Sequence, residues 1–118
     1  MSDAPGICIH EEAGWQPPDP LRAELLATLR AMSDAGLNVG TAGNASVRLS
    51  SARMLISPSG MPAERCTPQD MVEVEADGRY PGPLAPSSEW KLHHDLYAAF
   101  SAAGAVLHAD PPFATALA

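Results

Sequence analysis

Residues 19–36 constrain the fold most, because their pattern fits an amphipathic helix at both ends and along its length. Asp19 offers an N-cap and Pro20 suits the first helical position. Gly36 is the residue type that often follows a helix. Apolar residues recur at helical spacing between them: Leu21, Leu25, Leu26, Leu29 and Met32. The helix must therefore bury one face against another layer of structure.

The rest of the chain predicts short elements separated by turn residues. These are strands at 47–49 and 54–56, a strand at 71–75 that leads into an Asp77-Gly78 hairpin turn, a helix from near Ser88 to Gly104, a buried strand at 105–107 and a helix opening at Pro112. This order indicates an α/β layered domain with a mixed or antiparallel sheet. Residues 1–18 are expected to form a flexible N-terminal arm. Residues 19–118 are expected to be the N-terminal part of a larger domain, because the last helix would make fewer than two turns.

Charge and cysteine content narrow the classes of function. The formal net charge is −7 and no run of Lys or Arg is present, which argues against nucleic-acid and membrane partners. A small phosphorylated ligand remains compatible, because backbone N–H groups bind phosphate whatever the net charge. Cys8 and Cys66 lie far apart and no secretory signal precedes them, so we expect free thiols and a cytoplasmic location.

Ser87-Ser88-Glu89 stands at the start of the second predicted helix. Two hydroxyls there lie beside backbone N–H groups without helical partners, and the helix dipole adds positive charge, so the segment could hold a phosphate. The alternative is that Ser87 or Ser88 is only an N-cap. Glu89 and His93, at i and i+4, could chelate a metal together or form a surface hydrogen bond.

His108 follows a short apolar strand, where functional side chains often lie. A lone histidine there is more often structural, but Asp110 would lie on the same side of an extended segment and could complete a clamp for a divalent cation. The turns Gly43-Asn44 and Ser59-Gly60 allow backbone N–H groups to approach a ligand, although such dipeptides are also common in ordinary turns.

Five sequence blocks occur in order along residues 21–118. They are Gly36-Leu37-Asn38 with Gly40-Thr41-Ala42-Gly43-Asn44-Ala45-Ser46-Val47-Arg48; Met54-Leu55-Ile56-Ser57-Pro58-Ser59-Gly60; Pro86-Ser87-Ser88-Glu89-Trp90 with His93; Val106-Leu107-His108; and Ala114-Thr115-Ala116. Together they resemble the N-terminal part of the class II aldolase/adducin family, most closely its L-fuculose-phosphate aldolase branch. The resemblance implies a central, largely antiparallel sheet flanked by helices, in tetramers with active sites between subunits.

The resemblance also implies site roles. In such enzymes zinc is held by three histidines and, before substrate arrives, by a glutamate. Glu89 would be that ligand and the general acid/base, and His108 the first metal histidine. The positions implied to hold the substrate phosphate are Gly43, Asn44, Ser59, Gly60, Ser87 and Ser88.

One position departs from the family pattern. The family reads His-x-His, whereas this chain reads His108-Ala109-Asp110, so Asp110 stands where the second metal histidine belongs, and the chain contains no counterpart of the third. Aspartate is a harder ligand that favours Mn²⁺ or Mg²⁺ more than histidine does. The expected cofactor is Zn²⁺ or another divalent cation on Glu89, His108 and Asp110.

Three hypotheses follow for function. The first is a metal-dependent aldolase acting on a small phosphorylated ketose, with an epimerase for pentulose phosphates or a sugar-phosphate dehydratase as alternatives within enzymes. The second is a non-catalytic, adducin-like protein. The third is an inactive, truncated family member.

Overall fold

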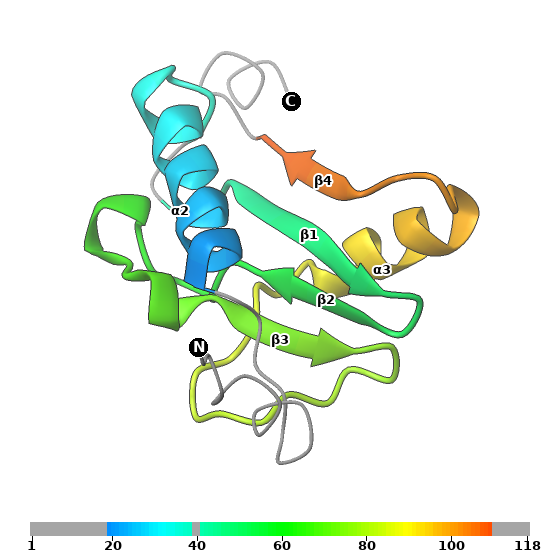
Figure 1. The fold of residues 1–118 in the computed structure, drawn as a ribbon. Coiled ribbons are helices and arrows are strands. Elements are labelled where there is room, and N and C mark those ends of the chain that lie inside the picture. The colour runs from blue at the N-terminus through cyan, green and yellow to red at the C-terminus, as the bar shows by residue number, and fades with distance from the viewer. Residues whose placement is uncertain (1–18, 39–40, 110–118) are drawn as a thin grey trace, which may run out of the picture.

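The described part of the chain folds into a four-stranded sheet with a helix on each face (Figure 1). The computed structural model describes residues 19–38 and 41–109. Its elements are helices α2 (Asp19–Asp34) and α3 (Trp90–Ala99), strands β1 (Asn44–Ser50), β2 (Arg53–Ile56), β3 (Val72–Glu75) and β4 (Ala105–His108), and short 3₁₀ turns η1 (Ala63–Arg65) and η2 (Pro68–Asp70). The strand order is β3-β2-β1-β4 and each neighbouring pair is antiparallel. The predicted α/β class and antiparallel sheet are confirmed.

The two faces of the sheet follow from alternation along β1 and β2. Leu55 packs against α2, whereas its neighbours Met54 and Ile56 lie in the cluster that contains Tyr97 of α3. The α2 side collects the apolar positions of β1, which are Ala45, Val47 and Leu49. The other face of β1 consequently presents polar residues to α3: Asn44, Ser46 and Arg48.

Helix α2 ends where the sequence predicts. Gly36 has φ +75°, and the Leu37 N–H donates to the Met32 carbonyl at 2.9 Å, which closes the C-terminus. Arg22 and Arg30 of this helix donate to the carbonyls of Met71 (2.7 Å) and Cys66 (2.8 Å). These two cations therefore brace the 63–71 connection. No helix within the described ranges is long and apolar enough to cross a bilayer.

The predicted hairpin at Asp77-Gly78 is wrong in its second half. The turn forms, with Gly78 at φ +93° and its N–H donating to the Glu75 carbonyl at 2.8 Å. Among the described residues no returning strand pairs with β3 after this turn, and β3 pairs with β2 instead. Prolines at 81, 83 and 86 lack the N–H groups that a returning strand would need.

Two further predictions need correction. Helix α3 ends at Ala99 rather than near Gly104, because Arg48 donates to the carbonyls of Tyr97 and Phe100 at 3.0 Å each and so satisfies its last turn. Strand β4 was predicted as buried, but it lies at the edge of the described sheet and the Leu107 side chain is 55% exposed. The 1–18 arm and the helix at Pro112 lie outside the described residues.

Candidate functional site

Three segments that carry predicted site residues lie side by side at one end of the sheet. The Ser57 N–H donates to the Ala45 carbonyl at 3.0 Å, which ties the end of β2 to the start of β1. The Ser87 N–H donates to the Ser57 carbonyl at 2.9 Å, and the Ser59 N–H to the Ala85 carbonyl at 3.0 Å. The 43–45, 57–60 and 85–89 segments thus converge where β4 also ends.

Glu89 is the polar centre of this region. Its Oε1 accepts a hydrogen bond from Asn44 Nδ2 at 2.8 Å and one from His108 Nδ1. Asn44 and His108 are direct partners in the β1–β4 register, which places both beside the carboxylate. The Glu89 and His108 side chains are 42% and 36% exposed, so the pair is open to solvent.

The surroundings of Glu89 favour its ionised form. The hydrogen bond from Asn44 is the largest cause that lowers the pKa of the Glu89 carboxyl below its ordinary value. The hydrogen bond and charge of His108 act in the same direction, against partial desolvation. Glu89 therefore stands as a carboxylate, able to accept a proton or to ligate a cation.

His93 has a different environment from the one predicted. Its side chain is 0% exposed and contacts Asn44 Oδ1 through Nε2 at 2.5 Å and Ser46 Oγ through Nδ1 at 2.6 Å. Neither predicted alternative for Glu89 and His93 occurs, because the Asn44 amide lies between the two side chains. Burial is the main cause that lowers the pKa of His93 to about 4, so the ring is neutral at physiological pH.

The serines at the start of α3 are not equivalent. Ser87 is buried, and its hydroxyl accepts the Glu89 N–H at 3.2 Å, so it supports the turn that precedes the helix, and the predicted serine N-cap is wrong. Glu89 rather than a serine occupies the N-cap position. Ser88, Ser59 and Gly60 are exposed and free of such local side-chain roles. Phosphate binding by this set stays a prediction.

The donor set for a divalent cation is incomplete in the described residues. Glu89 and His108 are in direct contact, but no group of three His, Cys, Asp or Glu side chains able to hold a metal occurs within 19–38 and 41–109. Asp110, the third predicted ligand, lies outside the described residues. The contact between Glu89 Oε1 and His108 Nδ1 places an oxygen donor beside a nitrogen donor, and divalent cations such as Zn²⁺ accept both kinds of ligand. The two residues fit a divalent cation as part of a site.

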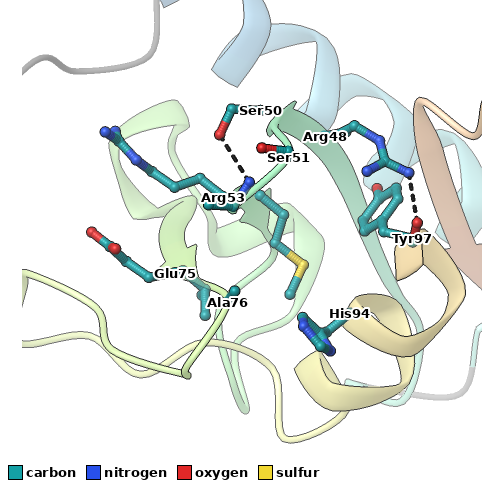
Figure 2. A pocket seen from close by; sticks show the side chains of 11 residues that line it. Arg48, Ser50, Ser51, Arg53, Glu75, Ala76, His94 and Tyr97 are labelled. Atoms are coloured by element: carbon teal, nitrogen blue, oxygen red, sulfur yellow. Dashed lines mark hydrogen bonds between the residues drawn. The ribbon is translucent and has the colours of Figure 1, made fainter. Parts of the chain in front are cut away.

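A separate hollow of about 30 Å³ lies between the β1–β2 turn and α3 (Figure 2). None of the predicted site residues lines it. Two cations line it: Arg48 already binds backbone carbonyls and lies 4.7 Å from the Tyr97 ring centroid, and Arg53 pairs with Glu73 at 2.5 Å. We assign this hollow no ligand.

Three buried residues near Glu89 were missed from the sequence: Ser46, His93 as a partner of Asn44, and Tyr97. The spacing of these residues in the sequence does indicate which of them share a face. Glu89, His93 and Tyr97 recur at every fourth position, and Asn44 and Ser46 at every second, which places each set on one face of its element.

The sequence matches the family model described as Class II Aldolase and Adducin N-terminal domain over residues 23–118. The chain belongs to this family. It is 46% identical over 98 residues to the 5-methylthioribulose-1-phosphate/5-deoxyribulose-1-phosphate aldolase of Rhodospirillum rubrum, a match that covers 83% of this chain and 44% of that protein. It is 40% identical over 97 residues to the methylthioribulose-1-phosphate dehydratase of Sorangium cellulosum, covering 80% of this chain and 46% of that protein.

Solved structures agree with the sequence relatives. An L-fuculose 1-phosphate aldolase superposes with a TM-score of 0.76 at 30% identity, covering 86% of this chain and 49% of that one. The chain therefore spans about half of the length of the relatives that it matches. The predicted family is confirmed, and with it the relation to sugar-phosphate aldolases.

Proposed function

We propose that this chain contributes to a metal-dependent aldolase that cleaves a small phosphorylated ketose by retro-aldol chemistry. The observation that carries the proposal is the ionised, half-exposed Glu89 carboxylate in contact with His108, beside exposed serine and glycine residues at a helix start. Two of the relatives described above are named for sugar-phosphate aldolase activities. Family membership alone leaves the reaction open, because a third relative is a dehydratase.

In this proposal the phosphate lies at the start of α3. Ser88, Ser59 and Gly60 would supply hydroxyl and backbone contacts, and the helix dipole would favour the anion. Gly43 and Ser87 lie in the same converging segments, where the Ser87 N–H itself donates to the Ser57 carbonyl. The phosphate grip would fix the sugar with its reacting carbons near Glu89.

Glu89 would move the proton. A carboxylate with a lowered pKa is in the base form at neutral pH and can take the proton from the substrate hydroxyl as the C–C bond breaks. Glu89, His108 and Asp110 would hold a divalent cation, Zn²⁺ or a harder ion because of the aspartate. Such an ion supplies Lewis-acid polarisation of the substrate oxygens when bound.

The test is cleavage of 5-deoxyribulose 1-phosphate and L-fuculose 1-phosphate by the purified chain, with Zn²⁺ or Mn²⁺ added. Dihydroxyacetone phosphate is the expected product, and Glu89→Gln should abolish its release while circular dichroism shows an unchanged fold. Glu24→Gln, at an exposed position of α2, is the matched control and should retain activity. Activity that survives Glu89→Gln would refute the role given to Glu89.

Two alternatives have specific support. The Sorangium cellulosum relative favours a dehydratase, which mass spectrometry distinguishes because water, rather than an aldehyde, leaves the substrate. A non-catalytic, adducin-like role is favoured by Asp110, which stands where the family pattern has a metal histidine. Phosphate binding without turnover of any substrate would support this second alternative, and so would a cation site that stays empty.

The proposal includes self-association and a cytoplasmic location. Phe100 and Leu107 are 61% and 55% exposed, and apolar side chains of this size are commonly covered in assemblies. Light scattering of the purified chain should give a mass above that of one chain. The described Cys66 is a buried free thiol, as a reducing compartment would leave it.

A further inference from the structure

Helix α3 and strand β1 meet along a row of polar side chains that continues inward from Glu89. Glu89, His93 and Tyr97 are spaced four residues apart, so successive side chains are about 6 Å apart along the helix. Asn44 and Ser46 are two residues apart, about 6.6 Å along the strand. The two spacings nearly match, which lets the helix residues interdigitate with the strand residues.

Four hydrogen bonds connect the row from end to end. Asn44 Nδ2 bonds to Glu89 Oε1 at 2.8 Å, and Asn44 Oδ1 to His93 Nε2 at 2.5 Å. Ser46 Oγ bonds to His93 Nδ1 at 2.6 Å and to the Tyr97 hydroxyl at 2.7 Å. Except for Glu89 every member is buried, with His93 and Ser46 0% exposed. Water therefore cannot replace a lost partner inside the row.

The direction of each bond follows from its neighbour. An ionised carboxylate only accepts, so the Asn44 NH₂ group must face Glu89 and its carbonyl oxygen must face His93. His93 Nε2 must then carry the hydrogen, which leaves a lone pair on Nδ1 because the ring is neutral. The Ser46 hydroxyl donates to that lone pair and in turn accepts from the Tyr97 hydroxyl.

The inner end of the row is fixed by a cation. Arg48 lies over the Tyr97 ring at 4.7 Å from its centroid and donates to the Tyr97 carbonyl at 3.0 Å (Figure 2). Its Nε also donates to the Ala103 carbonyl at 2.7 Å. Tyr97 is thereby held in the position from which its hydroxyl reaches Ser46.

We propose that His93 is a positioning residue that acts on Glu89 through Asn44. The Nε2–H of His93 holds the Asn44 amide with its NH₂ group toward the Glu89 carboxylate. Ser46 and Tyr97 in turn fix the tautomer of His93. The catalytic part of this inference rests on the proposed function. The geometric part does not. The Asn44 NH₂ group also donates to the Ala42 carbonyl at 3.3 Å, and His93 adds the donor that the Asn44 carbonyl oxygen needs. An amide turned by 180° would present its carbonyl oxygen to Glu89 and repel the carboxylate.

The direct test is nitrogen NMR of the unaltered chain labelled with ¹⁵N-histidine. Long-range proton–nitrogen correlations distinguish the Nε2–H tautomer, the Nδ1–H tautomer and the imidazolium ion. The proposal requires the neutral Nε2–H form of His93 from pH 6 to pH 8. Either of the other two forms in this range would overturn it, because Asn44 Oδ1 would lose its donor or the order of donors would reverse.

A second test uses variants at position 93. His93→Leu removes the donor, whereas His93→Gln keeps a side-chain N–H that can reach the same acceptor. We expect His93→Leu to shift the Asn44 side-chain amide resonances and to speed their exchange with solvent by about tenfold, and His93→Gln to restore most of the difference. His94→Leu, on the exposed neighbouring position, is the matched control and should change neither. Unchanged Asn44 resonances in folded His93→Leu would overturn the proposal.

Activity gives the third readout. If the chain cleaves a sugar phosphate, His93→Leu should lower kcat roughly tenfold, the equivalent of one lost hydrogen bond to a charged group, with KM changed less than twofold. A change confined to KM would overturn the positioning role. If the unaltered chain cleaves no substrate, the proposed function fails, while the tautomer and the Asn44 resonances still decide whether His93 sets the amide.

Discussion

The buried position of Ser46 gives a double-mutant test of the polar row. Ser46→Ala removes the hydroxyl that serves both His93 Nδ1 and the Tyr97 hydroxyl. Both groups then lose this buried partner, at about 1–3 kcal/mol each, so we expect a loss of about 2–6 kcal/mol in the free energy of unfolding. Tyr97→Phe leaves the Ser46–His93 bond intact and should cost about 1 kcal/mol.

The double variant separates this network from independent contacts. With Ser46→Ala and Tyr97→Phe together, only His93 lacks a partner, so Tyr97→Phe should recover about 1–3 kcal/mol once Ser46→Ala is made, although it costs about 1 kcal/mol alone. The expected coupling is therefore about 2–4 kcal/mol, measured by urea unfolding followed by circular dichroism. Additive losses, with a coupling near zero, would refute the hydrogen-bonded row.

Three further predictions concern the stability of the fold. Folding lowers the pKa of His93 to about 4 from its ordinary 6.5, so between these values the unfolded chain binds a proton that the folded chain does not. The free energy of unfolding should therefore drop by roughly 3 kcal/mol from pH 7 to pH 4. His93→Gln should lack this contribution to the pH dependence of stability. Gly43→Ala should destabilise the chain, since a Cβ there would meet the Asn38 side chain at 1.8 Å, whereas Gly82→Ala meets nothing; equal midpoints in urea would contradict this. Leu55→Ala should cost about 2–5 kcal/mol because the side chain is fully buried, and a loss under 1 kcal/mol would show a less tightly packed core.

Helix α2 and the strands could be predicted because their signals are local. The helix shows its caps and its apolar face in consecutive residues, and the end at Gly36 agrees with the prediction. The apolar run predicts β1 only at 47–49, whereas the strand begins at Asn44 because one of its faces carries polar side chains. The hairpin after β3 failed because the turn signal was read without the prolines that follow it.

The sequence predicts only part of the site, because some of its contacts depend on how distant elements pack. Glu89 and His108 stood out by residue type, and the structure brings them into contact. The roles of His93 and Ser46 depend on how α3 lies across β1, which no local pattern states. A histidine at i+4 from a glutamate is typical of a surface pair, and only the packing shows that an asparagine separates them.

In the proposed function, Glu89 and His108 form the reactive centre of a cation-dependent site. Metal content after dialysis against Zn²⁺ or Mn²⁺ tests it most directly, by mass spectrometry on the purified chain, Glu89→Gln and the Glu24→Gln control. We predict near-stoichiometric metal in the unaltered chain and in Glu24→Gln, and a loss of most of it in Glu89→Gln. A folded chain without bound metal, or equal metal in all three proteins, would contradict the account.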